Sequence, residues 1–150
     1  MRLDNVIEKL EQIAPLPIAE SWDKVGLHVG DRKRNVRRAM LCIDLTEAVM
    51  AEAAREKVQL IVAYHPPIFK PVERLTTDDW KGRVLLEAAK RGIAVYSPHT
   101  ALDNVRGGLT DWLCDGLGPH DVRWTIADHV AGSAKYKIIT FVPHDDADRV

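Results

Sequence analysis

The chain has 150 residues, enough for one domain with its own hydrophobic core. Hydrophobic residues make up 46% and charged residues 29% of the chain, as in ordinary globular proteins. The formal net charge of −1 argues against a tight nucleic-acid binder and against a basic membrane-surface protein. No apolar run approaches the roughly 18 residues of a membrane span, and the polar N-terminus has no signal-peptide core.

Two cysteines, Cys42 and Cys114, lie in apolar surroundings and are too few for a disulfide framework. We therefore expect buried, reduced thiols and a cytoplasmic protein. The basic run of residues 31–38 is expected to be a solvated connection rather than a phosphate-binding patch. The tryptophans are expected to be core or interface aromatics rather than platforms for nucleic-acid bases; they are Trp22, Trp80, Trp112 and Trp124.

The first predicted element is a helix over residues 3–14, where apolar side chains recur at spacings of three and four. Two prolines, Pro15 and Pro17, end this helix. Residues 18–30 are predicted to be an irregular or extended stretch bracketed by glycines.

Apolar runs and helices then alternate along the chain. The predicted buried strands are residues 39–45, 58–64 and 93–97. Thr46 can cap a helix that continues through Lys57, and residues 77–79 can start a helix that reaches Arg91, with Gly92 just beyond it. This alternation is typical of βαβ units, and the strands show little period-two alternation, as expected when helices cover both faces. We therefore predict an α/β fold with three layers: a parallel-rich sheet built of βαβ units, with helices on both faces.

The last part of the chain predicts a change of domain. A short helix follows Gly107 and Gly108, and residues 135–142 are predicted to be a fresh strand with a helix start after it. We expect a first domain over residues 1–130 and, over residues 131–150, the start of a second module that is cut off.

Polar side chains gather just beyond the ends of the predicted strands, where open parallel sheets bind ligands. Asp44 lies at the end of the first strand, Tyr64 and His65 lie at the end of the second, and His99 and Asp103 follow the third. Neighbouring strands lie roughly 4.8 Å apart, so these side chains can converge on one ion. Imidazole nitrogen and carboxylate oxygen are ligands for zinc, iron or manganese. The sequence therefore predicts a metal site containing His65, His99 and Asp103 at one edge of the sheet.

Other interpretations of these residues stay open at this point. A single histidine after a buried strand is commonly a hydrogen-bonded structural residue, and Pro66–Pro67 suits a plain strand exit as well as a preorganised ligand. An aspartate four residues after a histidine, as in His99 and Asp103, also occurs where the carboxylate hydrogen-bonds to a metal ligand or caps a helix. The sequence holds no phosphate-binding glycine loop, no structural zinc motif and no nucleophile turn to compete with the metal site.

Several segments of the sequence match a known family in their residues, order and spacing. They are residues 19–30, 42–46, 65–69, 96–103 and 107–113. In these segments the sequence resembles the N-terminal part of the NIF-three-like family, also named GTP cyclohydrolase I type 2 homologues. The resemblance covers residues 1 to about 118, and residues 131–150 resemble the opening of the family's inserted domain.

The resemblance implies an α/β protein that assembles into a homo-oligomeric ring, for example a hexamer. It also implies divalent metal ions (zinc, iron or manganese), up to two in each subunit. His65 and Asp103 match metal ligands, with Asp103 suited to bridging both ions. His99 matches a residue near the metals, either a ligand or a partner of one.

The resemblance further implies a pocket formed by Trp22 and Asp23 of the N-terminal signature, together with Tyr64 and Asp44. Many members of the family have two histidines before the proline where this chain has Tyr64 and His65. A neutral phenol is a poor zinc ligand because its pKa is about 10, so we expect Tyr64 to be a wall of the pocket. The family's remaining His and Glu ligands come from a later segment that this sequence lacks.

The function expected from these observations is that of a metal-binding protein of this family, specifically a metal-dependent hydrolase that uses metal-activated water. His99 is the residue expected to move the proton, and the small-molecule substrate is not specified by the sequence. The alternative is a non-catalytic metal-binding scaffold or regulatory interaction protein, which the replaced ligand and the lacking segment favour. A purely structural domain with hydrogen-bonded histidines is the third interpretation.

Overall fold

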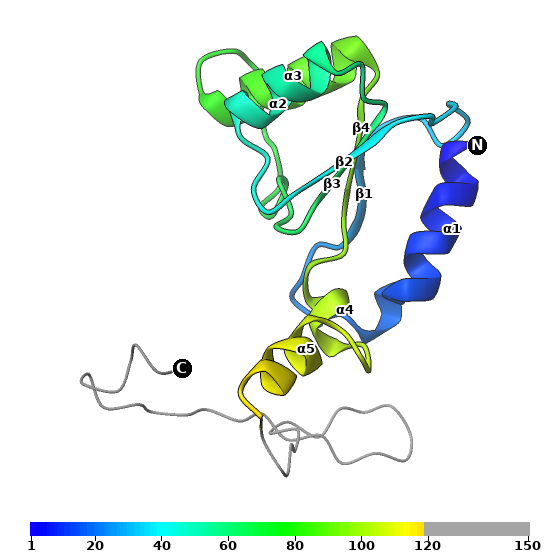
Figure 1. The fold of residues 1–150 in the computed structure, drawn as a ribbon. Helices are drawn as coiled ribbons and strands as arrows, with labels where there is room; N and C mark the ends of the chain where they lie inside the picture. The colour runs from blue at the N-terminus through cyan, green and yellow to red at the C-terminus, as the bar shows by residue number, and fades with distance from the viewer. Residues whose placement is uncertain (119–150) are drawn as a thin grey trace. The chain divides into compact units, whose positions relative to one another are not determined.

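A computed structural model describes residues 1–118 of the chain. The chain divides into two compact units, Met1–Leu109 and Thr110–Val150, and the fold below is that of the first unit (Figure 1). The strand predicted at residues 135–142, the module predicted at residues 131–150 and Trp124 lie outside the described residues. In the part that the structure describes, no helix is long and apolar enough to cross a membrane.

The first unit contains helices and strands in mixed order. They are α1 (Leu3–Ile13), the short 3-10 helix η1 (Leu16–Ile18), β1 (Gly26–Val29), β2 (Ala39–Cys42), α2 (Glu47–Arg55), β3 (Leu60–Ala63), α3 (Trp80–Arg91), β4 (Ala94–Ser97) and α4 (His99–Asn104). A further helix, α5 (Leu109–Gly116), follows. The predicted helices and strands of this part are therefore present, and η1, β1 and α4 are additional to them.

The four strands form one sheet in the order β1-β4-β3-β2. β2, β3 and β4 run parallel, with Leu60 of β3 opposite Ala39 of β2 and Ala94 of β4. Helices α2 and α3 provide the connections between these strands, so the predicted βαβ units are confirmed. β1 is antiparallel to β4, and it occupies part of the stretch for which the sequence predicted only an irregular or extended conformation.

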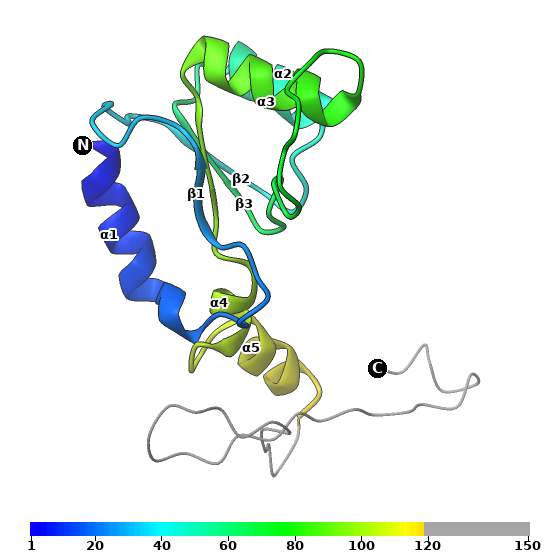
Figure 2. The same cartoon turned by 180° about the vertical axis from the view of Figure 1, so that it is seen from behind.

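Helices cover both faces of the sheet, which confirms the predicted three layers (Figures 1 and 2). On one face, α2 and α3 pack over Ile61 and Ala63 of β3 and Val95 of β4. On the other face, α1 packs over Leu60 and Tyr96. The two faces of β3 and β4 are therefore both buried, which explains why these strands are mostly apolar.

Local signals in the sequence determine where the two crossover helices begin and end. The Thr46 hydroxyl accepts a hydrogen bond from the Val49 N–H at 3.2 Å, and the Asp79 carboxylate accepts one from the Gly82 N–H at 2.7 Å. Gly92 ends α3 with a φ of 62°, in the left-handed region where glycine is favoured. The predicted caps are confirmed at these positions.

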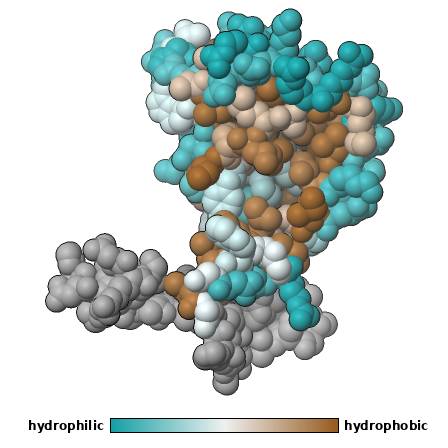
Figure 3. All heavy atoms as spheres, viewed as in Figure 1, coloured by the Kyte–Doolittle hydropathy of each residue, from teal (hydrophilic) through white to brown (hydrophobic). Residues whose placement is uncertain are grey.

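Strand β2 is less buried than the sequence predicted. It forms an edge of the sheet, and the side chains of Leu41 and Ile43 are 78% and 66% exposed. The apolar cluster beneath α1 includes Leu60 and Tyr96 but no residue of β2, so this face of the strand is uncovered within the described residues. In the space-filling view, hydrophobic side chains gather below the hydrophilic outer surface of α2 and α3 (Figure 3).

The cysteines and three of the tryptophans are less buried than core residues. Cys42 and Cys114 are free thiols, as predicted, but both are only partly buried. Trp22, Trp80 and Trp112 are each at least half exposed, so none of them is a core residue. The apolar character of a segment does not predict whether a tryptophan ring in it is buried, because burial depends on which face of the helix or strand packs against the sheet.

Tyr96 lies in the core without exposure, and its hydroxyl has no hydrogen-bond partner among the described residues. Burial, aided by the charge of Glu11, raises the pKa of Tyr96 to about 12. Because the pKa in the folded state is raised, the associated stability is complete below pH of about 10 and is lost as the pH rises toward 12.

We expect Tyr96→Phe to keep the fold and to raise the free energy of unfolding by about 1 kcal/mol at neutral pH, since it removes an unpaired buried hydroxyl. The alkaline loss of stability should also shrink in this variant. Urea denaturation at pH 7 and in alkaline buffer measures both effects. Tyr96→Ala, which removes the ring as well, should lose about 3–5 kcal/mol. A marked loss in Tyr96→Phe would show that the hydroxyl is bonded.

Candidate functional site

The polar residues predicted to converge do lie at one edge of the sheet, because β2, β3 and β4 are parallel and end together. The ladder between β2 and β3 continues past the strands: the Tyr64 N–H donates to the Cys42 carbonyl at 2.8 Å and the His65 N–H donates to the Ile43 carbonyl at 3.0 Å. These two hydrogen bonds hold the backbone that carries Tyr64 and His65 beside the end of β2.

The first pair at this edge consists of His65 and Asp44. The His65 Nδ1 atom lies 2.7 Å from the Asp44 Oδ1 atom. Both side chains are accessible, with 48% of His65 and 65% of Asp44 exposed. A carboxylate at Nδ1 directs the other ring nitrogen of the histidine outward as a potential ligand.

The second pair consists of His99 and Asp23, which are 76 residues apart in the sequence. The His99 Nδ1 atom lies 2.8 Å from the Asp23 Oδ1 atom, and the Asp23 side chain has no exposed surface. The pair forms because β1 is antiparallel to β4, so the segment before β1 lies beside the residues after β4, with Gly26 opposite Ser97. Residue spacing alone could not show this.

Hydrogen bonds keep the Asp23 carboxylate ionised in this buried position. Burial raises the pKa of Asp23, but hydrogen bonds from Thr100, His99 and the Lys24 backbone outweigh it and hold the pKa below its usual value. Thr100 is a residue of the site that the sequence analysis did not single out. It lies inside the matched segment of residues 96–103, next to His99, and that position was the available signal.

The third interaction joins Tyr64 and Asp103. The Tyr64 hydroxyl donates a hydrogen bond of 2.7 Å to the Asp103 carboxylate, and the Tyr64 carbonyl accepts one of 2.8 Å from the Ser97 hydroxyl. Burial, followed by the hydrogen bond and the charge of Asp103, raises the pKa of Tyr64 well above its usual value. The phenol therefore stays neutral at physiological pH, which is consistent with the expected wall of the pocket.

Aromatic rings pack tightly between these pairs. The centroid of the His99 ring lies 5.6 Å from that of His65 and 5.5 Å from that of Tyr64, and both contacts are edge-on. Trp22 contacts the His99 ring at 6.3 Å and the Phe69 ring at 6.1 Å, which closes one side of the cluster. All the residues that the sequence placed in the site are therefore neighbours in space: Trp22, Asp23, Asp44, Tyr64, His65, His99 and Asp103.

The chemistry of this cluster suits a divalent ion, but the described residues do not form a complete binding shell. Within residues 1–118, no group of three or more His, Cys, Asp or Glu side chains is close enough to hold a metal ion. Two imidazoles on one zinc ion have centroids about 5–6 Å apart, given Zn–N bonds of about 2.0–2.1 Å, so the His65 and His99 rings have a compatible spacing. The donor types fit a metal, and further ligands would have to come from outside the described residues.

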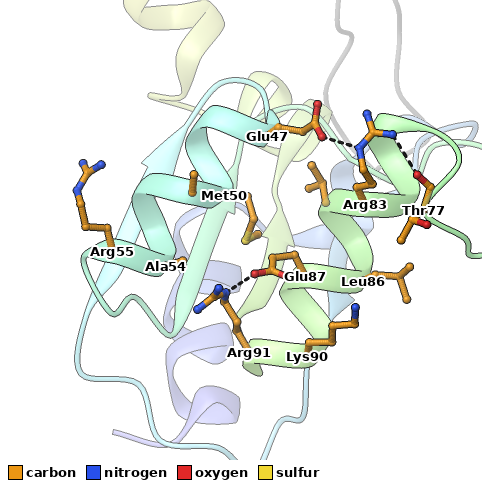
Figure 4. A pocket seen from close by; sticks show the side chains of 12 residues that line it. Glu47, Met50, Ala54, Arg55, Thr77, Arg83, Leu86, Glu87, Lys90 and Arg91 are labelled. Atoms are coloured by element: carbon orange, nitrogen blue, oxygen red, sulfur yellow. Dashed lines mark hydrogen bonds and ion pairs between the residues drawn. The ribbon is translucent and has the colours of Figure 1, made fainter.

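A groove of about 660 Å³ lies elsewhere, between α2 and α3 (Figure 4). Its rim carries two ion pairs, Arg83 with Glu47 at 2.7 Å and Arg91 with Glu87. These charges already have partners, and no histidine lines the groove. The candidate site is therefore the histidine and aspartate cluster at the sheet edge rather than this groove.

Comparison with known proteins identifies the family. The sequence model of the family described as Duf34/NIF3 (NGG1p interacting factor 3) matches residues 1–141. The chain belongs to this family. The resemblance found in the sequence motifs is thereby confirmed.

Members of the Duf34/NIF3 family with similar sequences are longer than this chain. NIF3-like protein 1 of Drosophila melanogaster is 43% identical over 123 residues, which cover 81% of this chain and 42% of the relative. The GTP cyclohydrolase 1 type 2 homolog of Clostridium perfringens is 42% identical over 118 residues, covering 79% of this chain and 45% of the relative. The chain thus spans less than half the length of these relatives.

Solved structures, one of them described as related to NIF3, share the fold. A Bacillus cereus protein related to NIF3 superposes with a TM-score of 0.74 at 34% identity, over 79% of this chain and 33% of that one. Reduced HcgD from Methanocaldococcus jannaschii also gives a TM-score of 0.74, at 28% identity, over 79% of this chain and 47% of that one. The α/β architecture of the described residues is therefore that of the family.

Thr100 offers a test of the hydrogen bonds that support the site. Its hydroxyl accepts from the Glu20 N–H at 3.0 Å and donates to Asp23, so Thr100→Val leaves both groups short of a partner. We expect the free energy of unfolding to fall by about 1–3 kcal/mol, measured by urea denaturation. The exposed Thr77→Val change is the matched control and should stay within about 0.5 kcal/mol. Equal effects of the two changes would contradict the network.

Proposed function

We propose that this chain carries a divalent-metal site and belongs to a metal-dependent hydrolase. The observation that supports this proposal is the presence of two neighbouring imidazoles, each with a carboxylate at Nδ1: His65 with Asp44 and His99 with Asp23. Metal-binding and general-base histidines are both commonly supported in this way, because the carboxylate orients the ring and raises its basicity.

Under this proposal His65 and Asp103 are the metal ligands within the described residues. A bound zinc, iron or manganese ion would supply Lewis-acid chemistry, which makes a coordinated water acidic enough to attack near neutral pH. Asp44 orients His65, and Tyr64 orients Asp103 through its hydroxyl. A second ion in the site would require ligands from outside this chain's described part.

His99 is proposed to move the proton. Its ring lies beside that of His65, with a centroid distance of 5.6 Å, and only 17% of its side chain is exposed. The buried carboxylate of Asp23 would stabilise the imidazolium that forms when His99 accepts a proton. Trp22 packs edge-on against the ring, with a centroid distance of 6.3 Å.

The substrate is proposed to be a small molecule with an electrophilic carbon or phosphorus atom. The name of the Clostridium perfringens relative, GTP cyclohydrolase 1 type 2 homolog, favours hydrolysis of a cyclic C–N bond among these reactions. It does not establish GTP as the substrate of this chain.

Metal binding tests the proposal directly. We expect the purified chain to bind Zn²⁺ or Mn²⁺ in calorimetric titrations, and His65→Ala and Asp103→Ala to weaken binding at least tenfold because each removes a ligand. His28→Gln is the matched control, since His28 bonds to the Lys24 carbonyl and lies outside the cluster. Wild-type affinity in both ligand variants would refute the metal site.

A second candidate function is a non-catalytic metal-binding scaffold that assembles with itself or with a partner. Two observations favour it: Tyr64 donates to Asp103 instead of offering a ligand, and no three-ligand group is present in residues 1–118. The family description, NGG1p interacting factor 3, agrees with an interaction role. The scaffold predicts bound metal and a homo-oligomer in light scattering, without hydrolysis of p-nitrophenyl phosphate or of cyclic amides. Turnover that depends on His99 would favour the hydrolase.

A further inference from the structure

Four polar groups contact the Asp23 carboxylate, two at each of its oxygens. The Lys24 N–H donates to Oδ1 at 2.6 Å, and the His99 Nδ1 atom lies 2.8 Å from the same oxygen. The Thr100 N–H donates to Oδ2 at 3.1 Å, and the Thr100 hydroxyl binds Oδ2 as well. One buried side chain thereby joins the segment before β1 to the residues that follow β4.

The positions of the protons in this network follow from the groups involved. The two backbone N–H groups can only donate. The Thr100 hydroxyl accepts from the Glu20 N–H at 3.0 Å, so its single proton is available for Asp23. Because an ionised carboxylate only accepts, the remaining partner of Oδ1, the His99 Nδ1 atom, must also carry a proton.

We infer that Asp23 is a positioning residue that commits neutral His99 to the Nδ1–H tautomer and leaves its Nε2 atom as an unprotonated electron-pair donor. Nε2 lies on the side of the ring away from Asp23, and the ring contacts those of His65, Tyr64 and Trp22. The tautomer follows from the hydrogen bonds alone. The inference rests on the proposed function only for what Nε2 then accepts, a proton or a metal ion.

The backbone of His99 shows that Asp23 positions more than the ring. His99 has a φ of 31°, in a region that residues other than glycine rarely adopt. One oxygen of Asp23 contacts the ring of His99, and the other accepts from the N–H of the next residue, Thr100. Asp23 thus stabilises the unusual backbone conformation and the ring orientation together, which prepares the site before anything binds.

The pair of His65 and Asp44 lacks these constraints and provides a matched control. Both side chains are exposed, and a single contact of 2.7 Å joins them. Water can replace Asp44 as the partner of His65, whereas no solvent reaches the Asp23 side chain. Substituting the two aspartates in the same way should therefore give different results.

The experiment is ¹⁵N NMR of the metal-free, full-length chain with labelled histidines. It is carried out at pH of about 8.5, well above the reference histidine pKa of about 6.5. Protonated and bare ring nitrogens have widely separated shifts, so the tautomer is read directly, and His99→Gln assigns the signals. We expect wild-type His99 to show a protonated Nδ1 and a bare Nε2.

In Asp23→Ala no carboxylate remains to accept from Nδ1–H, so the Nε2–H form of His99 should become substantially populated. Asp44→Ala should leave His99 unchanged. Thr100→Val should retain the wild-type tautomer, because Oδ1 of Asp23 still faces the ring. Circular dichroism confirms that each variant is folded.

A protonated Nε2 in the wild-type chain would overturn the inference, and this result needs no variant. An unchanged tautomer in folded Asp23→Ala would overturn it as well. If the tautomer is as inferred but the chain binds neither Zn²⁺ nor Mn²⁺, the positioning role stands and the proposed metal function fails. The two ideas are therefore tested separately.

Discussion

The antiparallel pairing of β1 with β4 is the contact on which the site depends. It places the segment before β1 beside the residues after β4, so that Asp23 meets His99 and Thr100 across 76 and 77 positions of sequence. Without it, His99 would lack the carboxylate that contacts its Nδ1 atom. The three parallel strands supply the other side of the site by ending at one edge, where Asp44, His65 and Asp103 gather.

The two aspartate–histidine pairs have different environments, and this difference organises the chemistry of the edge. Asp23 is fully buried and its charge is stabilised by surrounding donors, so its geometry is preorganised. Asp44 is largely exposed, and its contact with His65 contributes little to stability because water screens it. A rigid pair next to an adaptable one suits a site in which one histidine keeps its protonation pattern while the other adjusts to a ligand.

Much of the fold followed from local patterns in the sequence. The apolar runs and the caps at Thr46, Asp79 and Gly92 predicted the βαβ units. These signals are local, because a capping residue lies at the end of its helix and a buried strand is itself a short apolar run. The predictions were less accurate where burial depends on distant neighbours. Strand β2 was expected to be buried, yet Leu41 is exposed because β2 is an edge strand that α1 does not cover. Strand β1 was described only as irregular or extended, since its partner β4 lies far along the chain.

For the site, the sequence by itself determined which side chains follow the strands: Tyr64 and His65 after β3, and His99 and Asp103 after β4. The motifs around them also sufficed to recognise the Duf34/NIF3 family. Only the tertiary structure decided how these groups pair, with Asp103 bound to Tyr64, His65 to Asp44 and His99 to Asp23. The physical reason is that residue type and spacing report local conformation, whereas a hydrogen bond between distant side chains depends on strand order and register, which long-range packing selects.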